Sequence, residues 1–296
     1  MPRDRRERRR ARVVRLRSHR EGIDQALAGL GTGVLLKPAL SVGYARLSGG
    51  RIVVILDAAS PPGGVHAVRA HASTLAFEMS VGRQQVVVSA GPGAAFGAAS
   101  ELISRQTSSH SALEVAGASS AEFSSGDLAA RVFGPRLSAG PSLASVRQAQ
   151  DATGQWLLAT HDGYAASHGL LHERRVFVDA RGGELRGEDI LTVPDAAARE
   201  RFLNRAYDGT LSVIVRFHLH ADVIAEFDPT GDCVNIRLPD DERWVFRAAG
   251  GRLAIEPAMH YDPLEAAPIP SRQILVVCEA SEAVGQIIWA FTRLTG

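Results

Sequence analysis

The sequence has few cysteines, few aromatic residues and no long apolar run. Cys233 and Cys278 are the only cysteines among 296 residues, and two cysteines in a chain of this size do not establish a redox compartment. Both fall in predicted strands, 232–238 and 273–278. We therefore expect two free thiols in the core in preference to a disulfide.

No stretch of the sequence is apolar for long enough to span a membrane. A secretory signal is also excluded, because the basic residues near the start are followed by 22–31, Gly-Ile-Asp-Gln-Ala-Leu-Ala-Gly-Leu-Gly, which is not an uninterrupted apolar segment. Aromatic residues make up only 6% of the chain and do not interleave with a basic stripe. This argues against a nucleic-acid surface as the main function.

The chain does have enough apolar content for one large core or two smaller ones, since 45% of its residues are hydrophobic. Its formal net charge of +1 hides an uneven distribution, because residues 1–20 contain ten arginines against Asp4 and Glu7 and carry +8, which leaves −7 for the rest. We assign residues 1–21 to a basic tail and 22–296 to one domain. The tail is an unfolded segment, which we favour, or an arm for nucleic acid or anionic lipid.

Most of the chain is predicted to form short strands, many of them separated by turns rich in Gly, Pro and Asp. The predicted strands are 42–47, 51–57, 75–80, 84–91, 110–115, 155–161, 174–179, 211–219, 234–238, 243–247, 252–256, 274–278 and 286–292. Residues 194–207 are predicted to form a helix, 98–104 a helical turn and 22–30 a short helix. Many strands with few short helices predict an all-β fold, a large antiparallel β-sandwich.

One hairpin organises the sequence. In 75–80 apolar and polar residues alternate, as in a half-buried strand. A turn follows in which Gly82 can take a positive φ, and then comes a Val-rich strand, 84–91. The loop before the hairpin carries Arg69 and His71. We expect any chemistry to lie in this loop.

Several motifs occur in the order found in one protein family. They are Gly43-Tyr44-Ala-Arg46-Leu47, the histidine-bearing hairpin, His110-Ser111, His161-Asp162-Gly163-Tyr164, His172-Glu-Arg174-Arg175, Arg186-Gly-Glu188-Asp189 and Arg216-Phe-His218-Leu-His220. Each motif alone is weak. Their order and spacing over residues 22–296 resemble the C-terminal domain of heparinase II/III-like proteins, which implies a β-sandwich that follows a helical toroid.

The resemblance implies cleavage of uronic-acid-containing polysaccharides by β-elimination. This reaction needs a neutralised carboxylate, a base close to the proton beside it and an acid near the leaving oxygen. Most of those groups belong to the toroid, for which we find no counterpart here, so we expect this chain to be inactive alone. A non-catalytic sandwich that binds glycan or mediates assembly is the alternative.

The resemblance also implies partners and a location. The partners would be an acidic polysaccharide and a separate toroid domain, without nucleic acid and without a membrane span. The family points to the cell envelope or periplasm. The sequence itself, which shows no signal peptide, predicts a cytoplasmic protein as it stands.

The family contributes a His-Ala-His-Ala-Asp type of stretch to the cleft, in which the first histidine can face the substrate and the second can help to hold a structural metal. Here the stretch is Arg69-Ala-His71-Ala-Ser73, so His71 is the candidate catalytic residue. The carboxylate ligand would come from the next strand, where this chain has Ser89, and the remaining ligand is His110. Two imidazoles without a carboxylate make a poor zinc site. We expect structural histidines and no cofactor, or at most a degenerate zinc site at His71 and His110.

Four residues are candidates for substrate binding. The resemblance places Tyr164, His172 and Arg174 together, and Arg69 has a planar guanidinium that fits a uronate or a sulfate. A buried, hydrogen-bonded tyrosine and a solvent-exposed loop arginine are the alternatives. His218 and His220 share a face of a predicted strand, which would suit a metal or, as we favour, a structural pair.

Overall fold

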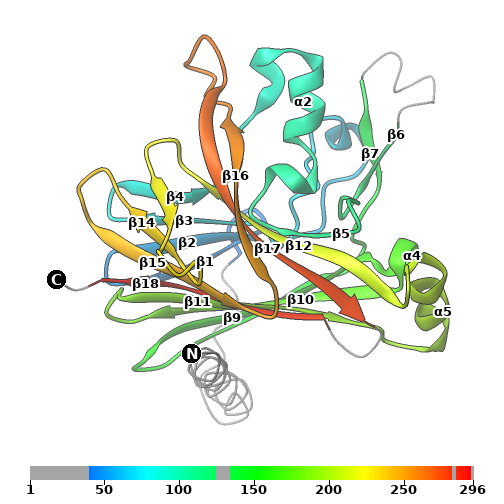
Figure 1. Cartoon of the computed structure of the whole chain (residues 1–296). Helices are drawn as coiled ribbons and strands as arrows, with labels where there is room; N and C mark the ends of the chain where they lie inside the picture. Colours follow the sequence, from blue (N-terminus) through cyan, green and yellow to red (C-terminus); the bar gives the residue numbers. More distant parts are fainter. Residues whose placement is uncertain (1–39, 125–133, 282–284, 295–296) are drawn as a thin grey trace.

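The computed structural model describes residues 40–124, 134–281 and 285–294, which form a sandwich of antiparallel sheets (Figure 1). The basic tail at 1–21, its boundary with the domain and the helical candidate at 22–30 lie outside these ranges. Two sheets of the described part have eight strands each, and a third has two. The predicted all-β sandwich with few short helices is confirmed.

The first large sheet, sheet I, draws its strands from both halves of the chain. Its order is β1-β2-β3-β4-β12-β17-β16, and β5 also pairs with β12. Its strands are β1 (Tyr44–Gly49), β2 (Ile52–Asp57), β3 (Phe77–Val81), β4 (Gln84–Val88), β5 (Leu113–Val115), β12 (Thr210–Leu219), β16 (Arg252–His260) and β17 (Ile269–Ser281). Gly82 in the β3–β4 turn has a φ of 62°, which confirms the predicted positive value.

The second large sheet, sheet II, has the order β13-β14-β15-β18-β11-β10-β9-β8. Its strands are β8 (Ala144–Gln150), β9 (Gly154–Tyr164), β10 (Leu170–Asp179), β11 (Glu184–Thr192), β13 (Ile224–Phe227), β14 (Val234–Arg237), β15 (Arg243–Ala249) and β18 (Gly285–Arg293). The small sheet pairs β6 (Glu122–Ser124) with β7 (Arg136–Ala139). The last described strand in the sequence, β18, therefore lies in the middle of sheet II.

Helices are few and short. The predicted helix at 194–207 is α5, whose N-cap Asp195 accepts a 2.8 Å hydrogen bond from the backbone nitrogen of Ala198. The α-helices are α2 (Ala98–Ser104), α4 (Ala165–His168) and α5 (Ala196–Arg205), and the 3-10 helices are η2 (Gly64–Val68), η3 (Gly93–Phe96) and η4 (Thr107–Ser109). No helix in the described ranges is long and apolar enough to span a membrane.

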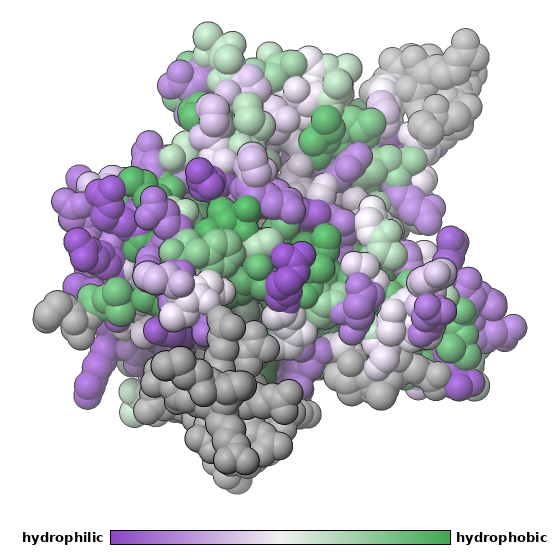
Figure 2. Space-filling view, in the orientation of Figure 1, coloured by the Kyte–Doolittle hydropathy of each residue, from purple (hydrophilic) through white to green (hydrophobic). Residues whose placement is uncertain are grey.

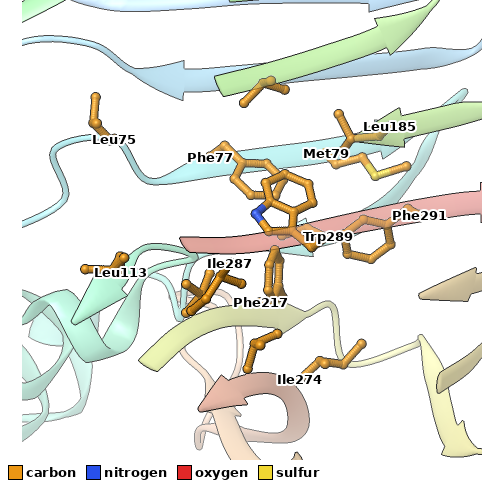
Figure 3. Close-up of a cluster of buried hydrophobic side chains, with 14 of the residues drawn as sticks. Leu75, Phe77, Met79, Leu113, Leu185, Phe217, Ile274, Ile287, Trp289 and Phe291 are labelled. Atoms are coloured by element: carbon orange, nitrogen blue, oxygen red, sulfur yellow. The ribbon is translucent and has the colours of Figure 1, made fainter. Parts of the chain in front are cut away.

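Aromatic side chains from both sheets meet in the centre of the sandwich (Figure 3). Phe77 of β3 stacks on Trp289 of β18, with ring centroids 5.2 Å apart and planes 2° apart. Phe217 of β12 meets the same indole edge-on at 5.1 Å. Gly187 of β11 pairs with Trp289, and a Cβ at this glycine would clash with the indole ring. The missing side chain at position 187 thus lets the tryptophan lie across β11.

The core extends to the edge of sheet I that is formed by β16. Leu253 and Ile255 of this strand and Cys278 of β17 are partly buried and pack against the core. Figure 2 shows hydrophobic residues near the middle of this face, where β16 and β17 cross, and hydrophilic residues at its left edge. Neither Cys278 nor the buried Cys233 is in a disulfide, as predicted.

Sequence patterns missed β6, β7, β8, β11 and β13 and misplaced some boundaries. In β11, Glu188 and Asp189 are charged but only 3% and 1% exposed, so the strand lacks the expected hydrophobic pattern. β8 reads Ala-Ser-Val-Arg-Gln-Ala-Gln, with one large aliphatic residue. The first hairpin turns at Gly50 and Arg51 and not at 48–50. In these segments, pairing with neighbouring strands and buried ion pairs determine the structure more than the local hydrophobic pattern does.

Candidate functional site

An open pocket of about 750 Å³ lies on the outer face of sheet I, beside the loop predicted to carry chemistry. Alternate residues of β1, β2 and β3 point into the core, so the residues between them face the pocket. The lining residues include Val42, Tyr44, Ile55, Asp57, Pro61, Pro62, Arg69, His71, Ser73, Glu78, Ser89 and His110. The fold therefore brings together Arg69, His71, Ser89 and His110, the positions taken from the family motif.

Hydrogen bonds join Ser89, His110 and His71. Ser89 Oγ lies 3.0 Å from His110 Nδ1, and His110 Nε2 lies 3.2 Å from His71 Nδ1. Both ring nitrogens of His110 and one ring nitrogen of His71 are therefore occupied by neighbours within this group. Which atom donates in each bond is set by the tautomers of the two rings.

Burial keeps both imidazoles neutral. Desolvation, assisted by the neighbouring His71 and His218 rings, lowers the pKa of His110 from 6.5 to about 3. Desolvation, assisted by the charge of Arg105, also lowers the pKa of His71. The two rings therefore add no positive charge at pH 7, and Arg69 is the single cationic side chain among the pocket-lining residues in the described part of the chain.

These residues do not fit the structural zinc that the family resemblance implied. Zinc needs ligands with free lone pairs, usually four of them, whereas both ring nitrogens of His110 and one of His71 are occupied by neighbours and Ser89 supplies no carboxylate. Within residues 40–124, 134–281 and 285–294, no group of three or more His, Cys, Asp and Glu side chains could hold a metal ion. The two histidines predicted as ligands are neighbours, but their donor set is incomplete.

We expect Ser89→Asp to raise zinc retention from far below one ion per chain. The substitution would place a carboxylate beside His110 Nδ1 and supply the third donor next to two imidazoles. Elemental analysis by plasma mass spectrometry after dialysis measures the zinc content. Ser89→Asn, which has a similar size and no charge, is the matched control and should retain no more zinc than the natural sequence. Stoichiometric zinc in the unmodified protein would contradict this view of the site.

Three further polar groups face the pocket and were missed as site residues. Across the β1–β2 ladder Tyr44 pairs with Asp57, and across the β2–β3 ladder Ile55 pairs with Glu78. Directly paired residues project from the same face of a sheet, so strand register is the signal that could have found them. The sequence pattern predicts these strands but does not specify which residues lie opposite each other in neighbouring strands.

Burial and nearby charge perturb the pKa values of Tyr44 and Asp57. Desolvation raises the pKa of Asp57, although a 2.7 Å hydrogen bond from the Ser73 hydroxyl opposes the rise. Desolvation and then the charges of Asp57 and Glu78 raise the pKa of Tyr44. The phenol therefore stays protonated and lies within electrostatic reach of both carboxylates.

The other predicted substrate-binding residues lie inside the sandwich and do not line this pocket. Tyr164 and Arg174 are fully buried, and His172 is 1% exposed. The Tyr164 hydroxyl donates a 2.7 Å hydrogen bond to the carbonyl of Leu113, and burial raises the pKa of this phenol. The structure thus uses the polar group of Tyr164 to join β9 to β5.

Arg174 and His172 meet on one buried carboxylate, Asp189. Its Oδ1 accepts hydrogen bonds from His172 Nε2 at 2.8 Å and from Arg174 Nε at 2.7 Å. The same guanidinium donates to the carbonyls of Leu75 at 2.7 Å and Ser111 at 2.9 Å, so it links sheet II to the loops of sheet I. Burial alone would raise the pKa of Asp189, but the Arg174 charge holds it well below its usual range.

The network continues to His161, and its hydrogen bonds have one direction. The backbone nitrogen of Gly163 donates to His161 Nδ1 at 3.0 Å, so His161 Nε2–H donates to His172 Nδ1 at 3.0 Å, and His172 Nε2–H donates to Asp189. His161 and His172 also form part of the wall of a second cleft, of about 530 Å³. Neither ring keeps a lone pair for a ligand there.

His218 and His220 have separate surroundings. The buried His218 donates from Nε2 to the carbonyl of Ser108 at 2.8 Å, and burial lowers its pKa to about 4. His220 lies beside His260, with ring centroids 5.4 Å apart, and accepts a hydrogen bond from the backbone nitrogen of Asp222. This geometry supports the structural interpretation over the metal pair.

Known proteins resemble the chain in sequence and in fold. The sequence model described as heparinase II/III-like, C-terminal, matches residues 32–290. FtsZ-localized protein C of Caulobacter vibrioides is 34% identical over 264 residues, which are 88% of this chain and 44% of that protein. The chain therefore spans less than half the length of this relative.

Two solved structures share the fold. The heparan sulfate lyase HepC from Pedobacter heparinus superposes with a TM-score of 0.62 at 17% identity, over 96% of this chain and 42% of the lyase. A heparinase III structure gives a TM-score of 0.62 at 12% identity, over 86% of this chain and 36% of that protein. Identities this low show a common fold alone.

Proposed function

We propose a function from the premise that this chain belongs to the heparinase II/III-like family and corresponds to its C-terminal region. In this proposal the chain is a non-catalytic binding domain that associates with FtsZ. The hydrogen-bonded group of Ser89, His110 and His71 carries the non-catalytic part, because three of its four ring nitrogens are occupied by neighbours and burial lowers the pKa of both imidazoles, which makes them weak bases. The identity with FtsZ-localized protein C supports the association.

The pocket lacks the groups that β-elimination requires. The base must lie within hydrogen-bond reach of the proton that it removes, and His71, the candidate base, already holds Nδ1 in a hydrogen bond with His110 and has a pKa that burial lowers, which weakens it as a base. Arginine stays protonated at ordinary pH and cannot replace it, so Arg69 offers charge but no base. Misplacement of reacting groups by about 1 Å costs on the order of a hundredfold in rate.

We expect this chain alone to leave acidic polysaccharides uncleaved. Incubation with heparin, heparan sulfate and alginate should give no rise in the ultraviolet absorbance of an unsaturated uronate product, while HepC from Pedobacter heparinus serves as the positive control for heparan sulfate. His71→Ala should behave like the natural sequence. A rise that His71→Ala abolishes would show that the sandwich carries catalysis, and the proposal would fail.

The second candidate function is polysaccharide lyase activity in an assembled form. The observation that favours it is the shared fold with two lyases, together with Arg69 and His71 on the wall of one pocket. In that case an acidic polysaccharide and a separately supplied toroid would be the partners, and the toroid would have to bring both the base and the acid.

Association with FtsZ would place the protein in the cytoplasm, where FtsZ resides. Co-sedimentation with polymerised Caulobacter vibrioides FtsZ measures the association directly. We expect the full chain to pellet with polymers and to stay in the supernatant when the nucleotide is omitted and FtsZ does not polymerise. Equal amounts in the pellet with and without polymers would contradict this part of the proposal.

A further inference from the structure

The outward face of β1, β2 and β3 places two carboxylates beside an aromatic ring. Tyr44 is directly opposite Asp57, and Glu78 is directly opposite Ile55, which lies two residues from Asp57 on the same strand. Burial raises the pKa of the Tyr44 phenol, and the charges of both carboxylates raise it further. One small surface therefore combines two negative charges, a phenol ring and an aliphatic side chain.

The charge of the pocket opposes a polyanion. Among the described residues that line it, Arg69 is the one cation, whereas Asp57 and Glu78 are anions and the two imidazoles are neutral. These described side chains together carry a formal charge of −1 at pH 7. A sulfated or uronic-acid polymer would meet two carboxylates on entry and would be repelled, so the acidic glycans of the family do not suit this pocket.

The apolar rim points to protein and not to sugar. Val42 is 94% exposed, Tyr44 48% and Ile55 37%, and all three line the pocket. Exposed aliphatic side chains gain little from the hydroxyl-rich surface of a sugar but gain from burial by another apolar side chain. Carboxylates next to an aromatic ring attract a cationic head, and the methylene stem of a lysine or arginine covers the apolar surface beside it.

We infer that this pocket binds a basic segment of a partner protein, with a lysine or arginine side chain between Asp57 and Glu78 and a neighbouring aliphatic side chain on the rim formed by Val42, Tyr44 and Ile55. The inference rests on the proposed function in that it identifies the binding site and the kind of partner for it. The charge complementarity is opposite to that expected of a glycosaminoglycan site.

Fluorescence anisotropy with three short labelled peptides tests the inference on the full chain. The three peptides share a Gly/Ser backbone sequence and two leucines. They differ at two positions, both of which are lysine in the first peptide, glutamate in the second and serine in the third. We expect the lysine peptide to bind most tightly and its affinity to fall with added salt. Glu78→Gln and Asp57→Asn should each weaken it about tenfold, the value of one charge-assisted hydrogen bond.

Matched controls separate a local effect from a general one. Glu256→Gln removes an exposed carboxylate from β16, outside the pocket, and should leave binding unchanged. Ile55→Ser should weaken the lysine peptide, whereas Ile224→Ser, at a similarly exposed isoleucine of β13, should not. Circular dichroism checks that each variant is folded.

Equal binding of the lysine and glutamate peptides, or binding of a heparin oligosaccharide that Glu78→Gln strengthens, would overturn the inference. The same variants keep this result distinct from the proposed function. If this chain co-sediments with FtsZ polymers and Glu78→Gln does not reduce the amount in the pellet, the association with FtsZ stands and the inference about the pocket fails. If the lysine peptide binds with the expected pattern and this chain does not co-sediment with FtsZ polymers, the pocket assignment stands and the association with FtsZ fails.

Discussion

Asp189→Asn will lower the free energy of unfolding by about 3–5 kcal/mol, because it leaves the Arg174 guanidinium buried without its counter-charge. Both side chains are fully buried, and their Oδ1 and Nε atoms are 2.7 Å apart. The same carboxylate accepts hydrogen bonds from His172 and, at 2.8 Å, from Trp289 Nε1. The substitution therefore disturbs a polar group in contact with the aromatic centre of the core.

Thermal unfolding followed by circular dichroism measures this loss. In a domain of this size, 3–5 kcal/mol corresponds to a fall in Tm on the order of 10 °C. Arg174→Met should cost a similar amount, while the double variant Arg174→Met, Asp189→Asn should recover part of the loss, because no unpaired charge remains. If the double variant lost the sum of the two single effects, the charge pairing would not be the cause.

A surface ion pair offers the matched control. Arg237 and Asp241 form a 3.0 Å pair four residues apart, with side chains 49% and 79% exposed. Asp241 also has a φ of 64°, which asparagine tolerates well. Asp241→Asn makes the same chemical change as Asp189→Asn and should shift the free energy of unfolding by less than about 0.5 kcal/mol.

Acid will destabilise the protein between about pH 6.5 and pH 4, well above the range in which most carboxylates titrate. Burial lowers the pKa of His110 to about 3 and of His218 to about 4, and it also lowers those of His71, His161 and His172. In the unfolded chain these rings take up a proton below about pH 6.5, whereas in the folded protein they take it up at lower pH, His218 near pH 4 and His110 near pH 3. Proton uptake therefore favours unfolding as the pH falls.

The expected slope follows from linkage. Where the unfolded chain binds one more proton than the folded protein, stability falls by about 1.4 kcal/mol per pH unit. Several histidines share this window, so the total loss between pH 6.5 and 4 should be several kcal/mol. Asp57, whose pKa burial raises, opposes the trend only near its own titration. Below about pH 3 the contribution of His110 levels off.

Urea unfolding at a series of pH values measures the effect. The unfolding free energy should be constant above pH 7 and fall steeply below 6.5. His110→Gln should reduce the slope by about one proton, whatever its effect on stability at pH 7, because glutamine does not titrate. A free energy that is flat from pH 7 to pH 4.5 would show that these rings are protonated in the folded protein.

Much of the fold could be predicted from the sequence, because its simplest strands have a pattern that packing alone creates. In β1 and β12 buried apolar residues alternate with more exposed ones, as expected for strands with one face on the core. β11 escaped because Asp189 faces the core and needs Arg174 from β10. A local window cannot show that a partner from another strand neutralises a charge.

The candidate site was predictable as a location but not as a set of roles. The motif order brought His71, Ser89 and His110 together, and the structure places them in hydrogen-bond contact. Their neutral state depends on burial by the surrounding loops, and the charge of the pocket depends on Asp57. Both depend on loop geometry or strand register, which motif spacing does not contain.

The position of β18 determines when sheet II can be completed during translation. This strand joins β15 to β11, so sheet II remains two separate pieces until residues 285–293 leave the ribosome. In sheet I, β4 likewise waits for β12, which follows it by more than a hundred residues. The nascent chain must therefore carry unpaired strand edges through most of its translation. Folding is then governed by late, long-range contacts, which makes it slow and leaves incomplete chains prone to aggregate.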